Sequence, residues 1–255
     1  MEAHRNEIVR QFTAQADGFA HAAAIRDEAA LDLLVGFSGA GPRDRVLDVA
    51  CGPGLVVCAF ARVVQEATGI DITPAMIEHA RGHAARLGLT NAQWRLGEIP
   101  PLPWPDETFD IVVSRYAFHQ LEDPLAVLGE MVRVCATGGR VVVCDLALAP
   151  EKVDAFNAMD RLRDPSHVRA FTLEQLRELF LATGLAQPRV AAGQLAGELE
   201  GLLERSFPAP GGADEVRRRF RASLEDDQLG VDARLAAGGR IAYSYPIAML
   251  AADVP

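Results

Sequence analysis

The sequence has no uninterrupted apolar run approaching the ~18–20 residues that a helix needs to cross a bilayer. Its first residues also lack the apolar stretch of a signal peptide. These absences argue against a membrane-spanning helix and predict a cytoplasmic protein with no membrane as a partner. The net charge of −10 repels a phosphate backbone, so we do not expect nucleic acid as the main substrate.

Cysteine is scarce, and its spacing argues against redox and metal chemistry. The chain has four cysteines, and no two of them form a C-x-x-C pair. Cys58 and Cys144 lie inside apolar runs, where a free cysteine usually fills space in the core. Such thiols suit a reducing compartment. The chain also lacks a carboxylate cluster of the kind that holds a catalytic metal, so no metal site is expected.

What the chain does contain is a glycine turn between an apolar strand and an apolar helix. The stretch Arg45-Val-Leu-Asp-Val-Ala-Cys-Gly-Pro-Gly54 begins as a buried parallel strand, and residues 55–64 can continue as a buried helix. Such a corner lets the backbone approach a nucleotide closely at the carboxyl edge of a sheet. Asp71 follows Gly52 by nineteen positions, which suits a carboxylate that accepts hydrogen bonds from ribose hydroxyls.

The third position of the glycine pattern separates two classes of ligand. A dinucleotide fingerprint needs a small residue there, because the helix must pack tightly on the strand. This chain has Val57 at that position, and it has no Tyr-x-x-x-Lys pair for hydride transfer. An NAD-dependent oxidoreductase therefore stays an alternative that these residues disfavour.

Three segments in order resemble the class I S-adenosylmethionine (SAM)-dependent methyltransferases, namely residues 46–54, Gly69-Ile-Asp71 and Phe109-Asp-Ile-Val-Val113. The likeness covers residues 43–146. It implies SAM as the cofactor, S-adenosylhomocysteine (SAH) as the product, and methyl transfer by in-line displacement. A protein that binds SAM without catalysis would carry the same motifs, so it is a second alternative.

From residue 42 onward, apolar strands alternate with helices, which predicts βαβ units and a mostly parallel sheet. We expect a Rossmann-like α/β fold with seven strands, an antiparallel strand 7, helices on both faces and a helical lid. Helices are expected to start at Asp123 and Thr172, and one is expected to end at Gly138-Gly139. The strands are expected at residues 45–50, 66–71, 92–96, 109–114, 139–146, 188–191 and 240–250.

The chain divides into four expected parts. Residues 1–40 form an N-terminal helical lid, and residues 41–192 form the SAM-binding core. Residues 193–238 form a helical insertion that covers the substrate, since long insertions on such scaffolds are usually functional, and 239–255 form the last strand. In the N-terminal part, Phe12 and Phe19 are expected over the cofactor, with plain packing against the sheet as the alternative. A homodimer is left open.

The resemblance assigns parts of the cofactor to individual residues. Asp48 would bind the methionine ammonium, and Gly52 and Gly54 would let the backbone approach the methionyl-ribose portion. Asp71 would bind the ribose hydroxyls, and Glu98, where the family has Asp, would accept from the adenine amino group. The alternatives are that backbone amides of the turn satisfy Asp48, and that Asp71 only favours a helix N-terminus. The further cofactor positions are Ala50, Ile72, Met76, Ile99, Ser114 and Arg115.

The acceptor site is expected just after the fourth strand. His119 titrates near neutrality and is the first candidate for a general base, with ordering of the loop or packing against the cofactor as the alternatives. Tyr116 would line the transfer chamber or bind the acceptor, and Asp145 should face the same opening. No Asn/Asp-Pro-Pro-Tyr and no double-glutamate loop is present. The resemblance is therefore to the ubiquinone/menaquinone-like and natural-product biosynthesis enzymes, which methylate carbon, nitrogen or oxygen of small molecules.

Overall fold

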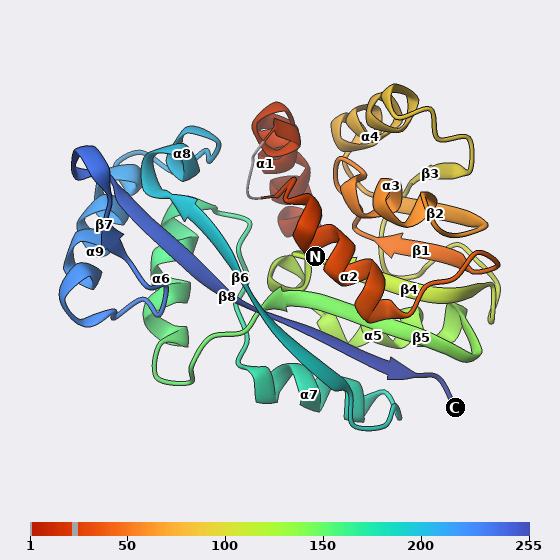
Figure 1. Ribbon diagram of the computed structural model, residues 1–255. Coiled ribbons are helices and arrows are strands. Elements are labelled where there is room, and N and C mark those ends of the chain that lie inside the picture. Colours follow the sequence, from red (N-terminus) through yellow and green to blue (C-terminus); the bar gives the residue numbers. More distant parts are fainter. Residues whose placement is uncertain (1, 22–24) are drawn as a thin grey trace.

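The computed structural model describes residues 2–21 and 25–255, with every side chain among them except those of residues 19–21. One sheet runs through the molecule in the order β3-β2-β1-β4-β5-β8-β6, and the two-residue β7 pairs with β8 (Figure 1). All neighbouring strands are parallel except at β8, which is antiparallel to its partners. The predicted Rossmann-like sheet with an antiparallel last strand is confirmed. The strands are β1 (Arg45–Val49), β2 (Glu66–Asp71), β3 (Ala92–Leu96), β4 (Phe109–Arg115), β5 (Cys135–Leu146), β6 (Arg189–Glu198), β7 (Arg234–Leu235) and β8 (Ile241–Asp253).

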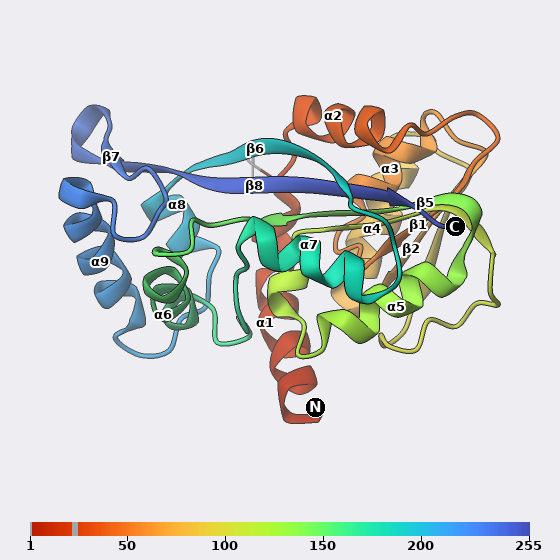
Figure 2. The same ribbon diagram turned by 90° about the horizontal axis from the view of Figure 1, so that it is seen from below.

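Helices cover both faces of the sheet, because the strands bury successive side chains on opposite sides. Val46 belongs to the core under α2 (Glu28–Ser38) and α3 (Leu55–Ala61), and Leu47 belongs to the core under α5 (Pro124–Val134) and α7 (Leu173–Ala182). Figure 2 shows the sheet edge-on, with α2 and α3 on one side and α5 and α7 on the other. A further helix, α4 (Pro74–Arg86), packs against α3, β2 and β3.

Both expected helix starts, at Asp123 and Thr172, are confirmed by their hydrogen bonds. The expected helix end at Gly138-Gly139 is wrong. Thr172 and Gln175 form the capping box of α7, and the Asp123 carboxylate accepts from the Ala126 amide at the start of α5. Helix α5 ends at Val134, four residues before Gly138, and β5 begins at once. Gly139 lies inside β5, where an added Cβ would come within 2.6 Å of the Asp110 carbonyl oxygen. This glycine therefore serves close strand packing and not a helix end.

The expected insertion at 193–238 begins too early and does not cover the cavity described below. Its first six residues continue β6, which pairs with β8 as far as Glu198↔Ala242. Only then do α8 (Leu199–Glu204) and α9 (Gly212–Asp226) follow. They lie with α6 (Val153–Arg163) along the part of the β6–β8 ribbon that extends beyond the sheet (Figure 1). None of the residues that line the cavity comes from this segment.

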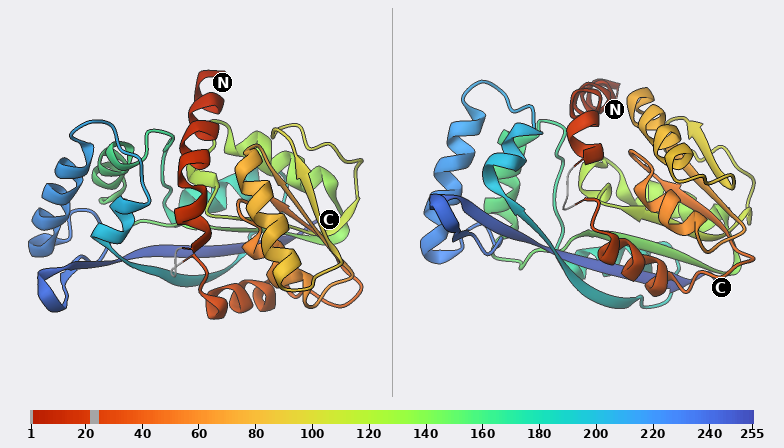
Figure 3. Two further views of the ribbon diagram at one scale, coloured as in Figure 1. Left: turned by 90° about the horizontal axis from the view of Figure 1, so that it is seen from above. Right: turned by 45° about the horizontal axis from the view of Figure 1, so that its top comes forward.

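The two N-terminal helices have different positions. Helix α1 (Glu2–His21) lies across the carboxyl edge of the sheet beside α4, whereas α2 packs on a face of the sheet against α3 (Figure 3). A buried polar contact also ties α1 to the loop after α6, because the Gln15 amide lies 3.5 Å from the Asp164 carboxylate. Phe12 lines the cavity, and the expected role of the Phe19 side chain lies outside the described residues.

A substitution at Gly54 tests how strongly the turn after β1 depends on glycine. Its φ is +77°, and an added Cβ would lie 2.7 Å from Ala80 Cβ and against the ring of Trp94. We expect Gly54→Ala to lower the free energy of unfolding by about 2 kcal/mol or more, from left-handed strain and overpacking together. Gly36→Ala is the matched control, since it lies in α2 with no atom within 4 Å of the added Cβ. Chemical denaturation of both variants should show loss of stability only for Gly54→Ala, and equal stability would contradict the packing argument.

Candidate functional site

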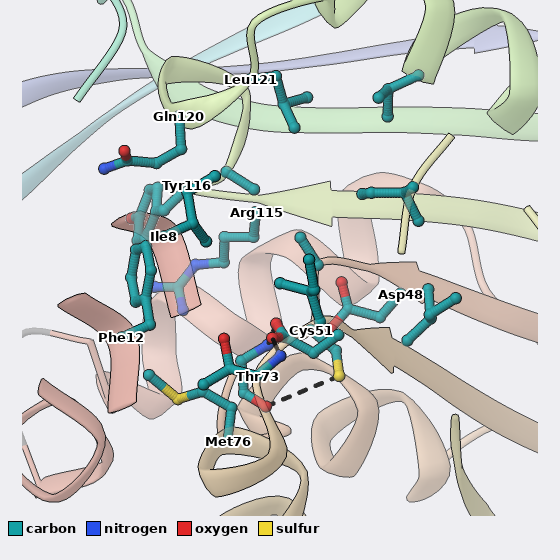
Figure 4. A pocket seen from close by; sticks show the side chains of 18 of the residues that line it. Ile8, Phe12, Asp48, Cys51, Thr73, Met76, Arg115, Tyr116, Gln120 and Leu121 are labelled. Carbon is teal, nitrogen blue, oxygen red and sulfur yellow. Dashed lines mark hydrogen bonds between the residues drawn. The ribbon is translucent and has the colours of Figure 1, made fainter. Parts of the chain in front are cut away.

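A cavity of about 420 Å³ opens at the carboxyl ends of β1, β2 and β4, a volume typical of small-molecule sites. Residues of the β1 turn, the β2–α4 corner and the β4 loop form its floor and sides. Helix α1 lies over it and contributes His4, Arg5, Ile8 and Phe12. Figure 4 shows the side chains of Ile8, Phe12, Met76 and Tyr116 converging on this space. In an open α/β sheet, this edge is where ligands bind.

Two non-glycine residues on the cavity wall have a left-handed backbone. Ala50 follows β1 with a φ of 59°, and Tyr116 follows β4 with a φ of 58°. Such a conformation costs a side-chain-bearing residue free energy, and it persists where the surrounding structure demands it. Both residues turn the chain sharply at the ends of neighbouring strands. The strain therefore lies where the backbone bends around the cavity.

Asp71 organises the corner between β1 and β2. One oxygen of its carboxylate accepts from the Gly52 amide at 2.9 Å, and the other accepts from the Thr73 amide at 2.8 Å. Burial raises the pKa of Asp71, although these backbone hydrogen bonds oppose the shift. Each carboxylate oxygen can accept a second hydrogen bond, and Asp71 lines the cavity. The side chain can thus hold the glycine turn and still accept from ligand hydroxyls.

Asp48 and Arg115 place opposite charges in the cavity without partners for all their atoms. Asp48 Oδ2 and Arg115 Nη2 are both buried and have no hydrogen-bond partner among the described residues. Arg115 Nη1 donates to the Ile25 carbonyl at 3.1 Å, and its guanidinium lies 4.2 Å from the centroid of the Tyr116 ring. Burial, together with the charge of Asp71, raises the pKa of Asp48 well above its usual range, while Arg115 acts in the opposite direction. The backbone amides of the turn leave Asp48 Oδ2 without a partner, which counts against the alternative that they satisfy this carboxylate.

Of the fourteen residues predicted for the site, nine line the cavity. Gly52 and Ile99 do so from the turn after β1 and the segment after β3, and Met76 does so from α4. Burial raises the pKa of Tyr116 to about 12, which favours the protonated hydroxyl. The nine are Asp48, Ala50, Gly52, Asp71, Ile72, Met76, Ile99, Arg115 and Tyr116.

Three predicted cofactor residues face away from the cavity. Gly54 packs against α4 and β3, so its lack of a side chain serves helix packing. Ser114 is buried, and its hydroxyl donates to the Val49 carbonyl of the neighbouring strand at 2.9 Å. Glu98 does not line the cavity, and its carboxylate pairs with Arg5 of α1 at 2.8 Å. For these side chains, direct contact with a ligand in this cavity is not supported.

His119 and Asp145 form a buried pair beside the cavity and do not line it. The His119 Nδ1 atom donates to Asp145 Oδ1 at 2.7 Å, and the two oxygens of Asp145 also accept from the Phe118 and Leu146 amides. Burial lowers the pKa of His119, but the charge and the hydrogen bond of Asp145 outweigh it, so the pKa is raised overall. The expectation that both face the ligand opening is therefore corrected. The geometry fits the alternative, in which His119 orders the loop.

Gln120, the residue next to His119, was not among the residues predicted for the site. Residues 118–120 form the short 3₁₀ helix η1, in which successive side chains point about 120° apart. Gln120 lines the cavity and is buried, and its Oε1 has no hydrogen-bond partner among the described residues. The signal available in the sequence was a polar loop after β4. That loop did not reveal which of its side chains points inward.

Within residues 2–21 and 25–255, no cluster of three or more potential metal ligands is found. In the same part of the chain, no helix is both long and apolar enough to cross a bilayer. All four cysteines are free thiols and are buried. Burial raises the pKa of Cys144 to about 12, so this thiol is protonated at neutral pH.

A family model described as a methyltransferase domain matches residues 41–184. YcgJ of Bacillus subtilis (strain 168), an uncharacterized methyltransferase, is 35% identical over 178 residues, which are 69% of this chain and 70% of that protein. The crystal structure of YcgJ superposes with a TM-score of 0.80 at 27% identity, covering 88% of this chain and 97% of that chain. The chain belongs to the methyltransferase-domain family.

The predicted class, a SAM-dependent methyltransferase with SAM as its cofactor, is thereby confirmed, and the oxidoreductase alternative is set aside. Demethylmenaquinone methyltransferase of Tropheryma whipplei (strain Twist) is 36% identical over 104 residues, which are 41% of this chain and 42% of that protein. The structure titled [4+2]-cyclase SpnF shares the fold, with a TM-score of 0.64 at 21% identity, covering 89% of this chain and 81% of that chain. The likeness to the SpnF structure concerns the fold alone.

The His119–Asp145 pair predicts a pH-dependent effect. Because the pKa of folded His119 is raised by Asp145, the pair stabilises the fold fully below the unfolded pKa, and this contribution is lost as pH rises through the folded pKa. We expect Asp145→Asn to lower the pKa of His119 in an NMR titration and to flatten this part of the stability profile. Asp17→Asn, on α1, is the control and should leave His119 unchanged. An unaltered His119 pKa in Asp145→Asn would contradict the pairing.

Proposed function

We propose that this enzyme transfers the methyl group of SAM to a small-molecule acceptor enclosed in the cavity. The observation that carries the proposal is the position of α1 above the ligand edge. On one side, Arg5 pairs with Glu98 at 2.8 Å; on the other, His4 Nε2 donates to the Gln120 carbonyl at 2.9 Å. A folded macromolecule could not present an internal group beneath this helix. The net charge of −10 also disfavours nucleic acid.

The proposed function includes one orientation of the cofactor in the cavity. SAM ends in a methionine zwitterion, so Asp48 Oδ2 would accept from its ammonium and Arg115 Nη2 would donate to its carboxylate. Asp71 would accept from the ribose hydroxyls, and Ile72, Met76 and Ile99 would contact the adenosine. Each of the two unpartnered charged atoms would then gain a partner of opposite sign. An isolated buried charge is costly, which makes this complementarity a strong source of ligand binding.

With the cofactor in this orientation, the methyl group would point toward Tyr116 and α1. Transfer then needs the acceptor nucleophile, the methyl carbon and the sulfur to be collinear, and holding them so supplies much of the acceleration. The apolar wall of Ile8, Phe12 and Tyr116 would exclude water from the sulfonium. A protein that binds SAM without transferring its methyl group is the remaining rival, and methyl transfer distinguishes the two.

The acceptor proposal is tested with SAM that carries a labelled methyl group. The purified protein is incubated with this SAM and a cell extract. We expect the label to appear in the small-molecule fraction and not in precipitated protein or nucleic acid. Arg115→Met is the control, because it should abolish the transfer by weakening cofactor binding. Label confined to macromolecules would overturn the small-molecule proposal, and absence of any transfer would favour the non-catalytic rival.

The cofactor orientation is tested by calorimetric titration with SAM, SAH and NADH. We expect SAM and SAH to bind and NADH not to bind. Arg115→Met and Asp48→Asn should each weaken SAH binding by about 10-fold to 100-fold, the scale of a lost hydrogen bond to a charged group. Gln228→Met, at an exposed position beyond α9, should leave the affinity unchanged.

We also expect the affinity for SAH to depend on pH. The ammonium favours ionised Asp48, whose pKa in the empty cavity is raised by burial. SAH affinity should therefore fall as pH falls through that pKa, and Asp48→Asn should flatten the dependence. Affinity that is equal in wild type, Arg115→Met and Asp48→Asn would refute this orientation.

A further inference from the structure

The cavity has a second end, away from the β1–β2 corner, whose wall is mostly apolar. Ile8 and Phe12 reach it from α1, and Tyr116 and Leu121 reach it from the loop after β4. Figure 4 shows Gln120 and Leu121 at the opposite end of the view from Thr73 and Met76, with Phe12 and Tyr116 between them. In the proposed cofactor orientation, this end is left for the acceptor.

Gln120 brings one unpaired polar atom to that wall. Only 5% of the residue is exposed, and Oε1 is buried without a hydrogen-bond partner among the described residues. Its backbone, by contrast, is fully engaged, because the amide donates to the Ala117 carbonyl at 2.9 Å and the carbonyl accepts from His4. A buried acceptor atom without a donor is unfavourable, so its presence on a cavity wall indicates a ligand group.

Three other polar side chains at the rim of this end have partners among the residues that the structure describes. Arg5 is paired with Glu98, and the Asp123 carboxylate accepts from the Ala126 amide at the start of α5. His4 donates to the Gln120 carbonyl. These contacts tie α1 and α5 to the rim of the cavity. Gln120 Oε1, in contrast, is buried with its hydrogen-bonding capacity unused within residues 2–21 and 25–255.

We propose that Gln120 binds a hydroxyl or N–H group on an otherwise apolar acceptor, and so selects alcohols, phenols or N–H heterocycles. This inference depends on the proposed function, since it names the substrate class of the same site. The amide oxygen of Gln120 accepts from such a donor, and the NH2 group of the same side chain can donate to the oxygen of a hydroxyl. An analogue without the donor would leave Oε1 unpaired, which is how buried polar groups discriminate between ligands of equal shape. Gln120 acts here as a positioning residue.

The test uses two probes of nearly equal shape, 1-naphthol and 1-fluoronaphthalene, of which only the first has a hydrogen-bond donor. Their dissociation constants are measured on protein saturated with SAH. We expect wild type to bind 1-naphthol about 10-fold more tightly than 1-fluoronaphthalene. Gln120→Met keeps the length of the side chain and removes its amide, so the ratio should fall to about 1. SAH affinity should stay unchanged in this variant.

Leu121→Met is the matched control, since it changes the same wall without removing a polar atom, and it should keep the preference for 1-naphthol. Gln120→Leu provides a second variant in case Gln120→Met folds poorly. Equal binding of the two probes to wild type, or a preference retained in both Gln120 variants, would overturn the inference. Failure of SAH to bind wild type would instead overturn the proposed function, so the two failures are distinguishable.

Discussion

The site contains two ionisable side chains of opposite charge that are buried, and each leaves one atom without a hydrogen-bond partner among the described residues. Asp48 Oδ2 and Arg115 Nη2 are buried at the ends of adjacent parallel strands. Burial without a partner is unfavourable for both atoms, and burial also raises the pKa of Asp48. A ligand with an ammonium and a carboxylate on one carbon satisfies both atoms at once. In the proposed cofactor orientation, the cavity would therefore be complementary to the amino acid end of the cofactor.

The rest of the structure keeps these charges in place. The glycine turn is held by the Asp71 carboxylate, which accepts from Gly52 and Thr73, and Gly54 lets the following helix pack against β3 and α4. On the other side, Arg115 donates to the Ile25 carbonyl, just before α2. The guanidinium therefore contacts the N-terminal segment directly. In the proposed cofactor orientation, this side chain would connect cofactor binding to the position of the N-terminal region.

The sequence was sufficient for the cofactor corner because its parts are local. A strand, a glycine turn and a helix that follow one another bring Ala50, Gly52 and Asp71 to one edge wherever the sheet is parallel. Glu98 could not be placed in the same way, because its partner Arg5 is far away in the chain. The extension of β6 was missed since Ala191 to Gly197 are mostly small residues with weak strand preference, and only pairing with β8 makes them a strand.

The loop after β4 shows why a motif does not determine side-chain direction. His119 and Gln120 are neighbours, yet the 3₁₀ turn points one toward Asp145 and the other into the cavity. Asp145 fixes these two directions, because its oxygens accept from His119 and from the Phe118 amide. Asp145 lies on β5, so the orientation of the loop is a tertiary effect. Titration near neutrality made His119 the more obvious candidate, whereas burial and an unused acceptor atom distinguish Gln120.

The central claim is that the paired charges bind the amino acid end of the cofactor, and a crystal structure of the SAH complex tests it most directly. We expect the SAH carboxylate within hydrogen-bond distance of Arg115 Nη2, its ammonium beside Asp48 Oδ2, and its ribose hydroxyls at Asp71. SAH bound in the reverse direction, with adenine at Arg115, or bound outside this cavity would contradict the claim.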